Sequence, residues 1–213
     1  MAKLRFVCVS MLLALGLHFA QAQQDVPPPS TYIPNLRVQV DDLPMIKAKS
    51  ADPSDVLAAA VEAVLHDKGL CCGRDSGLVD VVEAADASSL KAVSAKLQGR
   101  QHLSDGRPII VTADFIPASE MNIRQIVGTL SNKHALLMQW KSHIYVLYGA
   151  IFDEGPDGNG GIIYSAHKLL LIDPRYSDER RQTSFDRGTD DLAKVQGIMT
   201  LSVRQLRALL LRA

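Results

Sequence analysis

The sequence has no excess of charge of either sign, since 23 Lys and Arg residues balance 23 Asp and Glu residues over 213 positions. A nucleic-acid-binding protein usually has a basic excess, and a solvating tail has an acidic one. We therefore predict no nucleic-acid partner. The chain also lacks internal repeats, and its hydrophobic fraction of 47% is typical of a globular chain with a substantial core.

Long apolar runs are missing, except for a short one near the N-terminus. The run over residues 6–20 follows Lys3 and Arg5, and the tripeptide AQA at residues 20–22 fits the small-x-small cleavage pattern of a signal peptide. A membrane span needs about 20 apolar residues, so this run is short for one. We predict a signal peptide over residues 1–22, a periplasmic or secreted location and no stable membrane span after cleavage. An uncleaved anchor is the alternative.

Cysteine is scarce, and removal of the predicted signal leaves only Cys71 and Cys72. An exported protein enters an oxidising compartment, where cysteines commonly form disulfides. Neighbouring Cα atoms lie about 3.8 Å apart, whereas ordinary disulfides need about 4.4–6.8 Å. A bond between these two cysteines would therefore be strained. The pair instead indicates a nucleophile, buried thiols or a redox-sensitive pair.

Several motifs of cofactor and metal sites are also missing. The candidate ligands His134, His143, His167 and Asp173 lack the i, i+4 helical spacing typical of zinc sites. The acidic Gly-rich stretch at residues 153–161 lacks the closing Glu of a calcium loop. No Gly-x-Ser-x-Gly elbow occurs. We predict neither a metal nor another cofactor.

The remaining chain divides into a lead-in and one domain. Residues 23–51 are rich in proline and predict an extended lead-in with a short strand over residues 36–40. Residues 52–213 predict a single domain. Its first helix begins with the cap Asp52 and with Pro53, and it ends at Gly69. A second helix runs from Asp75 or Ser76 to about residue 85.

The rest of the domain combines helices with an antiparallel meander. We expect helices from Ser88 or Ser89 to Gly99 and over residues 121–130, and a short final helix over 204–212. Apolar runs predict strands over residues 109–113, 135–140, 143–152, 162–172 and 195–203. Residues 175–191 are rich in charge and predict an exposed loop. This order, with helices before the sheet, indicates an α+β fold.

The meander suggests a site. If Phe152 pairs with Ile162, His143 lies opposite Leu171, and Asp173 lies on the same face within diagonal reach. A register that differs by one residue would place Asp173 on the other face. An acid beside an imidazole fixes its tautomer, and the imidazole could then take a proton from a cysteine at a helix start.

Four stretches resemble a known family: Cys72-Gly73 opening a helix, GRPIIV at residues 106–111, HIYVLYGA at 143–150 and LIDP at 171–174. Over roughly residues 52–174 the chain resembles the papain-like cysteine peptidases, and most closely the branch that processes bacteriocin leaders. The resemblance implies a papain-like α+β fold, catalytic residues Cys72, His143 and Asp173, and a peptide or protein substrate.

One departure from that family leaves two functions open. Papain-like enzymes place a Gln shortly before the nucleophile to hold the oxyanion, but no Gln or Asn occurs between Gln39 and Cys72. His66 lies near the right distance, and Cys71 is an alternative nucleophile. The first hypothesis is a thiol peptidase or amidase. The second is a non-catalytic binding or interaction module with a structural or redox-sensitive Cys71-Cys72 pair. The oligomeric state is not predicted.

Overall fold

The structure is a computed structural model that describes residues 31–44, 46–66, 78, 89–103, 106–176, 182–186 and 194–205. The predicted signal peptide, Cys71 and Cys72 lie outside the described residues, as does the predicted second helix except for Leu78, which is helical and buried. The elements are β1 (Ile33–Gln39), α2 (Pro53–His66), α4 (Leu90–Leu97), β2 (Gly99–His102), β3 (Pro108–Pro117), the 3-10 turn η2 (Ala118–Glu120), α5 (Ile123–Ser131), β4 (Leu136–Trp140), β5 (His143–Pro156), β6 (Ile162–Ile172), β7 (Gln182–Asp186) and β8 (Val195–Gln205).

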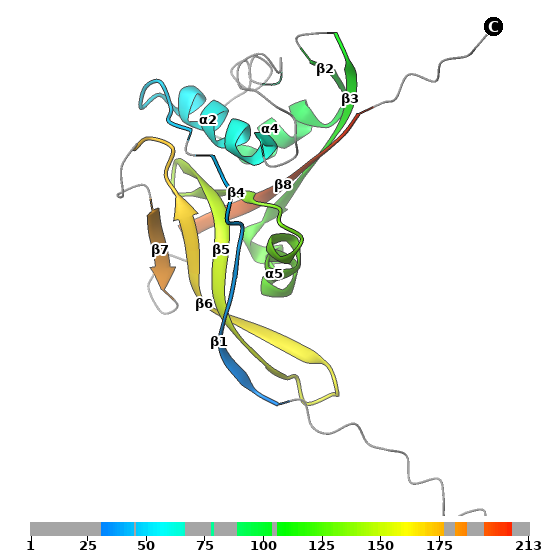
Figure 1. Cartoon of the computed structure of the whole chain (residues 1–213), viewed down its shortest axis with the longest axis vertical. Helices are drawn as coiled ribbons and strands as arrows, with labels where there is room; N and C mark the ends of the chain where they lie inside the picture. Colours follow the sequence, from blue (N-terminus) through cyan, green and yellow to red (C-terminus); the bar gives the residue numbers. More distant parts are fainter. Residues whose placement is uncertain are drawn as a thin grey trace, which may run out of the picture.

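The described strands form one antiparallel sheet in the order β2-β3-β8-β4-β5-β6-β7, with β1 paired to β5 outside this path (Figure 1). Residues 143–147 of β5 pair with β4, and residues 149–154 pair with β1. Because β6 takes the other edge of β5, β4 and β1 follow one another along the same edge. The fold is α+β, as predicted.

Short polar side chains define where three helices begin. The Asp52 carboxylate accepts a hydrogen bond from the Ser54 backbone N–H at 3.1 Å, which confirms the predicted cap of α2. Ser89 caps α4 by accepting from the Ala92 N–H. Asn122 does the same for α5 through the Arg124 N–H. The observed start of each of these three helices lies within two residues of the predicted start.

The helices cover the sheet through one large hydrophobic core. The helix α2 contacts β4, β5 and β8; α4 contacts β3 and β8; and α5 contacts β1, β5 and β6. Four consecutive residues of β5, Ile144 to Leu147, are buried. Since successive strand residues point to opposite faces, both faces of β5 are covered there, as the apolar pattern of this strand predicts. No described helix has the length and apolar character needed to cross a membrane.

The predicted register of the β5–β6 hairpin is wrong by four residues. Phe152 pairs with Ala166 instead of Ile162, and β5 continues to Pro156. The connection is shorter than predicted because the Asp157 carboxylate accepts hydrogen bonds from the Asn159 and Gly161 N–H groups, which folds the glycines into a tight turn. The register shifts at two irregularities, between Leu147 and Gly149 and between Ile151 and Phe152, so the pairing differs from the prediction by five residues at residues 149–151 and by four elsewhere. Where the shift is even, the predicted facing of the side chains is preserved.

Two further predictions need correction. The predicted loop over residues 175–191 contains β7, which pairs with β6 at one edge of the sheet. The predicted helix at residues 204–212 does not begin at Arg204, since β8 runs through Gln205 and pairs there with β3. Pairing with neighbouring strands outweighs the local sequence pattern in both segments.

Candidate functional site

Two of the predicted site residues, His143 and Asp173, lie where β5 begins and just after β6 ends. His143 and Tyr145 are the first and third residues of β5 and share one face. The pairing of Val146 with Ile172 is the last one in the β5–β6 ladder. Beyond this pair the chain turns at residues 173–176, where the Tyr176 N–H donates to the Asp173 carbonyl oxygen at 3.3 Å. This turn carries Arg175 to the side of His143.

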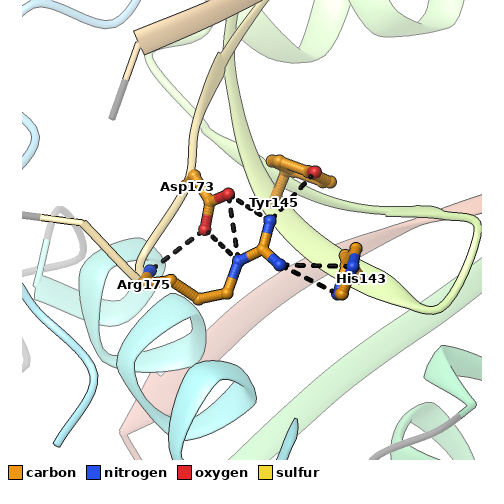
Figure 2. Close-up of polar contacts among 4 residues, drawn as sticks. All are labelled: His143, Tyr145, Asp173 and Arg175. Carbon is orange, nitrogen blue, oxygen red and sulfur yellow. Dashed lines mark hydrogen bonds and ion pairs between the residues drawn. The ribbon is translucent and has the colours of Figure 1, made fainter. Parts of the chain in front are cut away.

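Asp173 and Arg175 form an ion pair at this end of the sheet (Figure 2). The Arg175 backbone N–H donates to Asp173 Oδ1 at 3.0 Å, and the Arg175 Nε donates to Oδ1 and Oδ2 at 2.9 and 3.1 Å. Arg175 Nη2 donates to Oδ2 and to the Tyr145 hydroxyl. Asp173 is only 4% exposed. A buried carboxylate needs such a partner, so Arg175 stabilises the charge that burial would otherwise penalise.

The remaining guanidinium nitrogen of Arg175 lies against His143. The Nη1 atom is 3.2 Å from both His143 ring nitrogens. The lone pair of one ring nitrogen and the N–H of the other point in different directions within the ring plane. An atom at the same distance from both nitrogens therefore lies over the ring face. The guanidinium therefore contacts the imidazole through its Nη1 group, from outside the plane of the ring.

Burial and the neighbouring cation lower the basicity of the imidazole. Partial burial lowers the pKa of His143 below its ordinary value of 6.5, and the Arg175 cation lowers it further. Asp173 acts in the opposite direction, and Lys141 adds a smaller lowering effect. His143 is therefore neutral at neutral pH. The net local charge from these three neighbours is positive by one unit.

A small pocket opens beside the cluster, with a volume of about 140 Å³. The pocket lies between the start of α2, the β4–β5 turn and the chain after β6. Its lining residues are Ala51, Pro53, Val56, Ser142, His143, Ile144 and Arg175. The predicted site is therefore next to a cavity that can admit a small group.

The structure brings together two of the predicted site residues. His143 and Asp173 belong to the same cluster, with the Arg175 guanidinium between them (Figure 2). Cys71, Cys72 and the side chain of His66 lie outside the described residues. The sequence analysis missed Arg175 by placing it in an exposed loop, although its side chain is only 21% exposed. No local pattern pointed to Arg175, because residues 173–176 form a turn and do not continue the strand.

A second polar cluster lies on the β1–β5–β6 part of the sheet. Asp153 accepts hydrogen bonds from the Tyr32 hydroxyl and the Asn35 backbone N–H, and its Oδ2 lies 2.7 Å from His167 Nε2. These contacts lower the pKa of Asp153 to about 2, with the Tyr32 hydrogen bond as the largest cause. The cluster fastens β1 to the hairpin. Within the described part of the chain, no group of three or more His, Cys, Asp or Glu side chains could hold a metal.

The chain matches no model of a known protein family, and a search of curated proteins found no match. The papain-like resemblance therefore remains a prediction from the sequence.

Proposed function

We propose that the chain is a non-catalytic binding module of papain-like fold, exported to the periplasm or secreted, which recognises a peptide or protein. The observation that carries this proposal is the position of the Arg175 guanidinium, which is paired with Asp173 and lies against His143. In this proposal the Cys71-Cys72 pair is structural or redox-sensitive.

The chemistry of a thiol hydrolase explains why Arg175 matters. The base of such an enzyme takes a proton from the cysteine and becomes an imidazolium, which a neighbouring carboxylate stabilises. Here the neighbour on the ring face is a cation, which disfavours the imidazolium and lowers the pKa of His143. Both Asp173 oxygens accept hydrogen bonds from Arg175. This cluster is suited to present a guanidinium to a ligand.

The second candidate function is a thiol peptidase or amidase that uses Cys72, His143 and Asp173. One observation favours it: His143 and Asp173, which are 30 residues apart in the sequence, belong to one cluster beside a pocket, although the Arg175 guanidinium lies between them. The absence of a Gln or Asn between Gln39 and Cys72 weighs against it, because the oxyanion lacks the donor that the family uses.

Cysteine alkylation distinguishes the two functions. The mature protein is treated briefly with iodoacetamide at several pH values, with and without reductant, and the intact mass is measured. We expect no fast label near neutral pH, and any labelling should rise toward the ordinary thiol pKa of about 8.5. The rate should be the same in His143→Ala, because His143 does not activate a thiol in a binding module.

His102→Ala is the matched control, since His102 is an exposed histidine on β2. A single fast label at neutral pH that maps to Cys72, disappears in His143→Ala and persists in His102→Ala would contradict the proposal. That result would support the thiol hydrolase.

A further inference from the structure

The pocket beside Arg175 has walls of two kinds. Ala51, Pro53, Val56 and Ile144 supply an apolar side, and Ser142, His143 and Arg175 supply a polar one. Its volume is about 140 Å³, whereas one water molecule needs about 10–15 Å³ on the same measure. The pocket can therefore hold several non-hydrogen atoms that combine a polar end with a small apolar body.

The polar wall retains donor capacity. Arg175 Nε and Nη2 donate to Asp173, and Nη1 lies 3.2 Å from the His143 ring nitrogens. A neutral imidazole has a single acceptor nitrogen, so at least one of the two Nη1 protons is left to donate elsewhere. An arginine side chain has five N–H donors and no acceptor. The Nη1 group is thus the part of the guanidinium that can still donate to an anion. The Ser142 hydroxyl, at the exposed turn before β5, is a second donor on the same wall.

The charge around His143, on the polar wall of the pocket, is suited to a single negative charge. The charged groups that act on His143 are Arg175, Lys141 and Asp173, two cations against one carboxylate. The Lys141 ammonium lies 4.1 Å from the centre of the Trp140 ring, which places it at the adjacent turn. A monoanion neutralises the net positive charge, and a dianion would reverse it.

We propose that this pocket binds a carboxylate group carried on a small apolar body, as at the C-terminal residue of a peptide. The carboxylate accepts hydrogen bonds from Arg175 Nη1 and Ser142, and its apolar body packs on Val56 and Ile144. The proposal names the ligand class of the binding module and so rests on the proposed function. A flat carboxylate suits the planar guanidinium.

The test compares two probes that differ only in charge, N-acetylglycine and N-acetylglycinamide. Each is titrated into the mature protein labelled with ¹³C-histidine, and the ring signal of His143 is followed by NMR. N-acetylglycine should shift this signal saturably. The amide should bind at least about tenfold more weakly, as expected when a charge-assisted hydrogen bond is lost.

Three variants locate the binding. Arg175→Gln removes the donor, and Ala51→Leu fills the pocket from an exposed position without touching the Arg175–Asp173 pair. Both should weaken N-acetylglycine by about tenfold. Arg124→Gln removes an exposed cation from α5 and should leave the affinity unchanged. If Arg175→Gln does not fold, the affinity of Ala51→Leu for N-acetylglycine alone tests the inference.

Other results would overturn the inference. These are equal binding of the two probes, unchanged affinity in Ala51→Leu, and tighter binding of inorganic phosphate than of N-acetylglycine. Release of ammonia from N-acetylglycinamide, lost in Cys72→Ala, would instead contradict the proposed function, because it reports hydrolysis. The two failures are therefore distinguishable in the same samples.

Discussion

At the scale of single residues, Arg175 decides how the site is interpreted, because it changes the properties of both residues that the sequence singled out. It supplies the counter-charge for the buried Asp173 carboxylate, and it lies on the face of the His143 ring. The sequence could name His143 and Asp173 from their places at strand ends. It could not name Arg175 as their link, because this depends on the register of a hairpin whose turn is folded by Asp157.

The pKa of His143 tests this arrangement. We expect the wild-type protein to titrate below 6.5, because burial and the Arg175 cation both disfavour the imidazolium. Arg175→Gln should raise the His143 pKa, since the cation is lost and the Asp173 carboxylate then acts with less opposition. The change is measured by NMR titration of the ring protons.

Arg175→Lys is the matched variant, because it keeps the positive charge but loses the flat guanidinium group. Its His143 pKa should stay closer to the wild-type value than that of Arg175→Gln. Equal pKa values in all three proteins would mean that the cation does not act on the ring.

At the scale of elements, the strands with continuous apolar runs were predictable, and those defined by distant partners were not. The predicted strand over residues 162–172 has the observed bounds of β6, because its burial is encoded locally. The strand β7 was missed because five residues with a single apolar side chain, Phe185, give little local signal, and an edge strand is held by backbone pairing. The position of β8 between β3 and β4 depends on contacts distant in sequence.

Two glycines lie where neighbouring strands of the sheet approach one another closely. A side-chain carbon added at Gly149 would lie 2.9 Å from the Val38 carbonyl oxygen of β1, and one at Gly197 would lie 2.6 Å from the Ile116 carbonyl oxygen of β3. Gly149→Ala and Gly197→Ala should each lower the free energy of unfolding by about 1–3 kcal/mol, the usual cost of overpacking. Urea denaturation measures this loss.

Gly128 in α5 supplies the control, because nothing lies within 4 Å of an added carbon there. Gly128→Ala should raise the free energy of unfolding by about 0.5–1 kcal/mol, since alanine favours the helix. We therefore expect alanine to lower the free energy of unfolding at the two strand positions and to raise it at the helix position. Stabilisation by Gly149→Ala or Gly197→Ala would mean that the strands can separate without cost.

At the scale of the whole molecule, the pairing of β1 joins the N-terminal segment to a hairpin more than a hundred residues later. Tyr32 and Asn35 precede and begin this strand, and both donate hydrogen bonds to Asp153 in β5. Figure 1 shows β1 running along β5, from near the tip of the β5–β6 hairpin toward the end where α2 and α4 lie. The Asp153 carboxylate therefore helps to hold together two strands of the sheet, β1 and β5, that are distant in the sequence.

The acid stability of the protein should reveal this contribution. The native pKa of Asp153 is about 2, against an ordinary value of 3.8. A lowered native pKa stabilises the fold above the ordinary value, and this stabilisation is lost as the pH falls toward the native pKa. Asp153→Asn should thus be less stable than wild type at neutral pH, and the difference should shrink between about pH 4 and pH 2.

Asp114→Asn provides the comparison, because it removes an exposed carboxylate from β3. Urea denaturation at a series of pH values should give nearly parallel curves for this variant and wild type, while the curve of Asp153→Asn is flatter in acid. Some acid sensitivity should persist in Asp153→Asn, because hydrogen bonds also lower the pKa values of Asp52 and Asp157. If the Asp153→Asn curve stays parallel to wild type down to pH 2, the carboxylate does not fasten β1 to the hairpin.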